Sequence, residues 1–181
     1  SPLFIAMPLV ITAMIFHQAL MAEAKGVSLQ WFAVSFIAFA IVRVPFSVLT
    51  GRIVDHIGSA WLFCIHLLPL TAGIAALITL SSPWVVPLYW LCAGVTVGMG
   101  TVLQTTVIAE RIAPERLGTA RSLVGAATIV ASAVGPSLYG VGLAAGATIP
   151  AILWVCVAGL LGTTLIGVIA TRQEKIGPES L

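Results

Sequence analysis

Residues 51–58 read Gly-Arg-Ile-Val-Asp-His-Ile-Gly, and this short stretch lies between two long apolar ones. Charged residues make up only 8% of the chain, so an arginine and an aspartate framed by glycines stand out. Charged segments between apolar runs are where a chain leaves a lipid bilayer. We therefore predict that residues 51–58 form a loop at a membrane surface.

The composition is that of a membrane protein. The chain is 60% hydrophobic with a mean hydropathy of +1.14, whereas soluble domains carry about 25% charged residues. No formally charged residue lies between Asp55 and Glu110, or between Arg121 and Arg172. A spanning helix needs about 20 apolar residues, so each gap holds two helices and a turn. Since these runs lack the alternation of barrel strands, we predict an all-α, polytopic membrane protein.

The apolar pattern predicts six transmembrane helices in one bundle over residues 1–171, followed by a polar cytoplasmic tail at 172–181. The predicted spans are 3–22, 29–50, 60–80, 84–107, 119–139 and 148–171. Gly135-Pro136 falls near the end of the fifth predicted span.

Basic residues predict the orientation of these spans. If the spans alternate, one side holds only Lys25 beside Glu23, and the other side holds the remaining loop and tail cations, Arg52, Arg111, Arg116, Arg121, Arg172 and Lys175. Cytoplasmic loops are enriched in lysine and arginine. We therefore expect the N- and C-termini of this segment to be cytoplasmic and the protein to lie in the cell (inner or plasma) membrane.

The spacing Gly51-x-x-x-Asp55-x-x-Gly58, between the second and third of six spans, resembles the signature loop of the major facilitator superfamily of transporters. The segment from Glu110 to Arg121 resembles the loop between the fourth and fifth helices of a half of such a transporter. Basic residues that usually follow the aspartate and the last glycine are replaced by His56, Ser59 and Ala60. This degenerate copy is typical of the C-terminal half. The resemblance implies a second six-helix bundle as partner.

The resemblance also implies a gating role for these two segments. Gly51 is expected to end the second span, and Asp55 to lie at the amino end of the helix that begins near Gly118, where a carboxylate is stabilised by about 0.3–1 kcal/mol. Charged residues of the two segments would complete a cytoplasmic charge network. The residues assigned to the gating and structural loop are Gly51, Arg52, Asp55, Gly58, Glu110, Arg111 and Arg121. The alternative is an ordinary solvated loop.

Arg43 is the first candidate for substrate binding. It lies eight residues before Gly51, about 12 Å along a helix, which places it deep in the bilayer. Charges at that depth usually face a bundle interior and mark a substrate pathway. Arginine also grips carboxylates in a bidentate manner. Some organic-anion members of the family, such as the monocarboxylate-like group, carry a similar arginine. The alternative is a structural arginine that reaches the membrane edge.

His17, Gln18 and Gln104 are further substrate-binding candidates. His17 could relay protons in a symporter because the pKa of histidine is near neutral, or it could be a hydrogen-bonded interior residue. The spans contain no paired carboxylates, histidine cluster or nucleophile motif, so we predict no enzyme, no cofactor, no metal site and no nucleic-acid partner.

The sequence thus predicts secondary active transport of a small solute, with an organic anion such as a carboxylate as the candidate, by alternating access across the bilayer. Two alternatives stay open. One is a half-size transporter that pairs with another copy. The other is a membrane sensor or assembly protein that keeps the fold without transporting.

Overall fold

The computed structural model describes residues 2–176, and within them it is helical with no strand. The helices are α1 (Leu3–Phe16), α2 (Gln18–Ala24), α3 (Leu29–Ile57), α4 (Ser59–Ile65), α5 (Leu68–Thr79), α6 (Val85–Arg111), α7 (Leu117–Ala144) and α8 (Ile149–Ile176), with a 3-10 turn, η1 (Pro114–Arg116), before α7. Five segments in this part of the chain are long and apolar enough to span a membrane, and α1 with α2 makes a sixth if the bent pair is one span. The all-α membrane fold is therefore confirmed.

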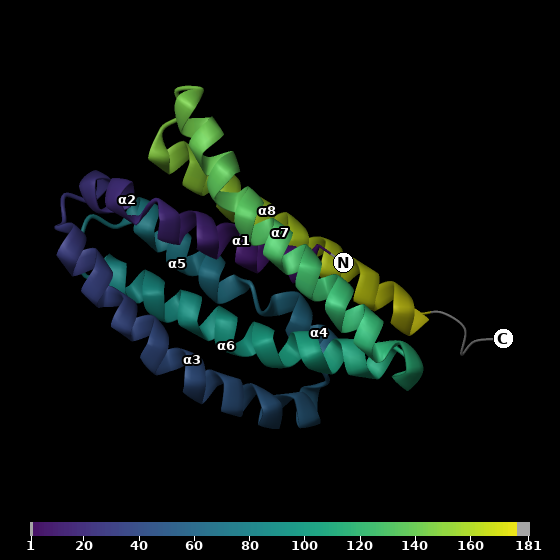
Figure 1. Cartoon of the computed structure of the whole chain (residues 1–181). Coiled ribbons are helices and arrows are strands. Elements are labelled where there is room, and N and C mark those ends of the chain that lie inside the picture. The colour runs from purple at the N-terminus through teal and green to yellow at the C-terminus, as the bar shows by residue number, and fades with distance from the viewer. Residues whose placement is uncertain (1, 177–181) are drawn as a thin grey trace.

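Helix α6 lies in the middle of the bundle, with α3 on one side and α1, α7 and α8 on the other (Figure 1). Its side chains Tyr89, Trp90 and Leu103 are fully buried. Small residues let α3 approach closely: a Cβ atom on Gly94 would lie 2.7 Å from the carbonyl oxygen of Phe39. Such close contacts hold helices together in a bilayer, where dispersion must do what the hydrophobic effect does in water.

The structure corrects the prediction for residues 51–58. They are not a loop, because α3 continues through Gly51 to Ile57 and ends at Gly58, whose φ is +89°. Ile53 and Val54 explain the extension, since both pack against the core one turn beyond Gly51. The left-handed φ of Gly58 is one that side chains with a Cβ rarely adopt. Gly58, not Gly51, therefore ends the helix.

Two helices predicted to be continuous are broken. The first predicted span bends by 68° at His17, between α1 and α2. There the His17 ring nitrogen Nδ1 lies 2.9 Å from the Ala13 carbonyl oxygen, the same oxygen that accepts the His17 backbone N–H. Side chains that enter the helical hydrogen-bond ladder are a recognised cause of kinks. The third predicted span is interrupted between α4 and α5, just before Pro69.

The last two helices are longer than predicted. Gly135-Pro136 lies inside α7 rather than at its end, where Gly135 packs against the backbone of Leu9 in α1. Helix α8 runs to Ile176, so the first part of the predicted tail at 172–181 is helical. The rest of that tail, residues 177–181, lies outside the described residues.

The end of the bundle away from the arginines is fastened by turn contacts. The Lys25 amine donates to the Leu80 carbonyl oxygen at 2.9 Å, and burial lowers the pKa of Lys25. The Trp31 indole donates to the Pro83 carbonyl oxygen at 3.1 Å and meets Trp84 edge-on at 5.4 Å. These contacts tie the start of α3 to the turn between α5 and α6.

Candidate functional site

An open groove of about 720 Å³ runs between α3 and α6, and Arg43 lies in it. We call it the Arg43 groove and define it by six of its lining residues, Phe36, Phe39, Arg43, Ser47, Thr101 and Thr105. Arg43 is the midpoint of α3, with 14 residues on either side within Leu29–Ile57 (43 − 29 = 57 − 43 = 14). At 1.5 Å per residue it lies about 21 Å from each end of the helix.

The Arg43 side chain is exposed, and within residues 2–176 it makes no hydrogen bond or ion pair. An arginine at the centre of a spanning helix costs about 2.5–3.5 kcal/mol on insertion scales. No acidic side chain of the described residues offsets this cost. The charged side chain thus lies halfway along α3 and faces an open groove.

Hydroxyl groups surround the arginine on both helices. Ser47 Oγ donates to the Arg43 carbonyl oxygen at 2.9 Å. Thr101 Oγ1 donates to the Val97 carbonyl oxygen at 2.6 Å, and Thr105 Oγ1 to that of Val102 at 2.8 Å. Each hydroxyl donates its hydrogen bond to a backbone carbonyl oxygen of its own helix, so its lone pairs can accept a hydrogen bond from a ligand.

The other predicted binding residues do not share this groove. Gln104 is half-buried and does not line it. His17 and Gln18 lie at the α1–α2 break, where the His17 ring stacks on Tyr139 of α7 with centroids 4.3 Å apart. The scarcity of charge in an apolar run predicts Arg43 as the main candidate. The same criterion misses Ser47 and Thr101, although the four-residue spacings Arg43–Ser47 and Thr101–Thr105 place each pair on one helix face.

The predicted gating residues cluster at one end of the bundle, which we call the basic end and define by Arg52, Arg111, Arg116, Arg121 and Arg172. There the Ser59 hydroxyl donates to the Glu110 carboxylate, which links α4 to α6. Asp55 is exposed in the last turn of α3 and makes no hydrogen bond or ion pair with any described residue. In Figure 1, α6 lies between α3 and α7, and the contact of Asp55 with the amino end of α7 stays a prediction.

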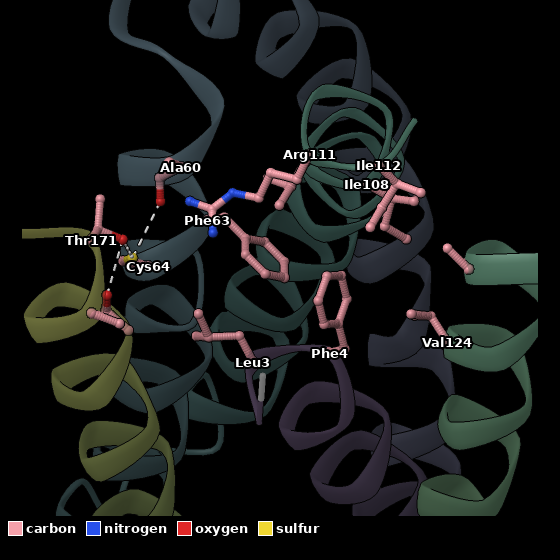
Figure 2. Close-up of a pocket in the computed structure, with 14 residues that line it drawn as sticks. Leu3, Phe4, Ala60, Phe63, Cys64, Ile108, Arg111, Ile112, Val124 and Thr171 are labelled. Atoms are coloured by element: carbon pink, nitrogen blue, oxygen red, sulfur yellow. Dashed lines mark hydrogen bonds between the residues drawn. The ribbon is translucent and has the colours of Figure 1, made fainter. Parts of the chain in front are cut away.

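The Arg111 side chain points into a cavity at the basic end. Figure 2 shows its side chain reaching from α6 toward Ala60 and Phe63, into a cavity of about 310 Å³ at the basic end. In the same cavity the Cys64 thiol lies 3.2 Å from Thr171 Oγ1. Arg52 and Arg121 are exposed and line no part of this cavity. The cytoplasmic charge network stays a prediction.

Helices that are long and apolar enough to span a membrane identify a polytopic membrane protein. The family model described as Major Facilitator Superfamily matches residues 3–180, so the chain belongs to this family. Its members are membrane transporters rather than enzymes, and they handle small molecules in a lipid bilayer. A search of the curated proteins finds no match. Membership of the monocarboxylate-like subgroup stays a prediction.

Proposed function

We propose that this chain is the C-terminal bundle of a secondary active transporter that moves a small organic anion by alternating access. The observation that carries the proposal is the unpaired, exposed Arg43 at the midpoint of α3. The groove around it has a volume of about 720 Å³, within the range of about 300–1,000 Å³ typical of small-molecule sites. A carboxylate could occupy both arms of the guanidinium.

A second six-helix bundle would complete the site. The groove is open, and α3 carries large exposed apolar residues beside it, such as Ile41, Val44 and Val48. A partner bundle across this face, either another part of the protein or another copy, would enclose a ligand at Arg43, as in transporters that rock about a midplane site.

The orientation of the bundle in the membrane and the coupling of transport to protons belong to the same proposal. The basic end would face the cytoplasm of the cell (inner or plasma) membrane, which puts the N- and C-termini of this segment on that side. His17, at the α1–α2 break, is the candidate for proton symport. The gating role is proposed for the residues that the resemblance assigned to it, which include Glu110 but not Arg116, and the Ser59–Glu110 hydrogen bond ties one of them to α4.

Neutralising Arg43 tests the proposal. In the intact protein in proteoliposomes, Arg43→Gln should reduce uptake of carboxylates at least tenfold, because one charge-assisted hydrogen bond is worth about 1.5–3 kcal/mol. Arg43→Lys should retain part of the uptake but with a raised KM, since an ammonium lacks the bidentate fork. Arg116→Gln, which removes an exposed charge from η1, is the matched control and should leave uptake unchanged.

Two results would contradict the proposal. Wild-type kinetics in both Arg43 variants would remove Arg43 from the site. A folded, reconstituted protein that moves no solute at all would instead favour the non-transporting alternative, a membrane sensor or assembly protein.

A further inference from the structure

The Arg43 groove has one aromatic wall. Phe39 and Phe36 lie four and seven residues before Arg43, which places all three on the same face of α3. The two phenyl rings are stacked, with centroids 4.9 Å apart and planes inclined by 15°. Phe36 also meets Trp90 of α6 edge-on at 4.7 Å and 87°. The aromatic wall therefore packs against the fully buried indole of Trp90, which orients the Phe36 ring.

The wall is accessible from the groove. Phe36 is 38% exposed and Phe39 only 8%, so Phe36 is the ring of the wall that a ligand can reach, and it lines the same open volume as the arginine. Seven residues of helix separate Phe36 from Arg43, which corresponds to about 10 Å along α3. Phe39 and Ala40 lie between them and also line the groove, so the intervening surface is apolar. The groove thus offers a cation at one end and a flat apolar surface at the other.

We propose that the Arg43 groove selects aromatic carboxylates, with the carboxylate on the Arg43 guanidinium and the ring against the exposed part of Phe36. This inference rests on the proposed transport of organic anions and names the class of anion. Aromatic pairs gain energy beyond the area they bury, because the positive edge of one ring meets the negative face of another. An aliphatic ring of the same size and charge lacks that gain. The hydroxyls of Ser47, Thr101 and Thr105 keep the Arg43 end of the groove polar.

Binding measurements on the intact protein in nanodiscs test this inference with three probes. Benzoate carries both features, cyclohexanecarboxylate has the charge without the aromatic ring, and benzamide has the ring without the charge. Benzoate should bind about two- to tenfold more tightly than cyclohexanecarboxylate, and benzamide should bind least. Phe36→Leu should bring the ratio of the two acids close to one, whereas Phe36→Tyr should keep it.

A matched control separates this effect from loss of any exposed phenylalanine. Phe16→Leu removes a ring that is 72% exposed at the end of α1, away from the groove, and should preserve the ratio. Arg43→Gln should weaken both acids to a similar extent.

The possible failures are distinguishable. Equal binding of both acids, or a ratio that Phe36→Leu leaves intact, overturns the aromatic inference, while a loss of both acids in Arg43→Gln still supports an anion site. If other carboxylates bind but neither benzoate nor cyclohexanecarboxylate does, the aromatic inference is likewise overturned and an anion site is still supported. If no carboxylate binds, the inference and the proposed organic-anion function both fail.

Discussion

The carbonyl oxygen of Arg43 accepts a hydrogen bond on its own helix and lies close to Gly98 of the facing helix. Ser47 Oγ donates to it at 2.9 Å from one turn further along α3. On the facing helix, a Cβ atom on Gly98 would lie 2.5 Å from the same oxygen and 3.1 Å from Phe46 Cβ. No residue with a side chain fits there unless α3 moves away. Gly98 thus acts as a positioning residue for Arg43, although it touches no ligand.

Gly98→Ala should therefore impair both stability and anion affinity. The added methyl group meets backbone rather than a flexible side chain, and such overpacking costs about 1–3 kcal/mol. We expect a lower Tm and a raised KM for the transported anion, because α3 shifts at the level of Arg43. The control is Gly125→Ala in α7, where nothing lies within 4 Å of the new atom; there helix propensity favours alanine by up to about 1 kcal/mol. Equal Tm values for the two variants would contradict this account.

At the residue scale, what could be predicted from sequence depended on how rare the residue type is. Arg43 stands out because charges are scarce in an apolar run. Ser47 and Thr101 do not, because hydroxyl residues are common in spanning helices and most bond their own backbone, as these two do. Their place beside Arg43 depends on how α3 packs on α6, which one sequence does not reveal.

At the element scale, the two glycines of the 51–58 segment have different roles. Sequence analysis expected Gly51 to end the helix, yet nothing lies within 4 Å of a Cβ atom on Gly51, and its conformation is helical. Gly58 has the left-handed φ of +89°. The spacing of glycines identified the family correctly but not the end of the helix. Ile53 and Val54 pack against the core, and these contacts stabilise one further helical turn.

Two alanine substitutions test this difference. Gly51→Ala should raise the free energy of unfolding by about 0.5–1 kcal/mol, since glycine inside a helix is the weaker helix former. Gly58→Ala should lower it by about 1–3 kcal/mol, because alanine is strained at a positive φ combined with an extended ψ. Reversible unfolding of both purified variants in the same detergent gives the comparison. If Gly51→Ala were the destabilising change, α3 would end where the sequence pattern first suggested.

At the scale of the whole molecule, the fold was predictable because a bilayer allows few solutions. Backbone amides cannot remain unpaired in lipid, so long apolar runs must be helices. The breaks at His17 and before Pro69 were not predictable in the same way, because hydropathy does not indicate where a span bends. Nor does hydropathy indicate which helices are neighbours. The α3–α6 groove exists because Gly94 and Gly98 admit the α3 backbone, a pairing that only the structure reveals.

The orientation of the bundle is the last expectation to test. Ser81, in the turn between α5 and α6, and Ala113, between α6 and η1, are both exposed and lie at opposite ends of α6. The positive-inside rule places the arginine-rich Ala113 side in the cytoplasm. In intact cells a membrane-impermeant maleimide should therefore label Ser81→Cys, whereas Ala113→Cys should react only after permeabilisation. The control is the protein with its native cysteines alone, since Cys64, Cys92 and Cys156 are at least partly buried within spanning helices. The opposite labelling pattern would invert the bundle, and Arg111 and Arg121 would then face outward against the charge bias that orients membrane proteins.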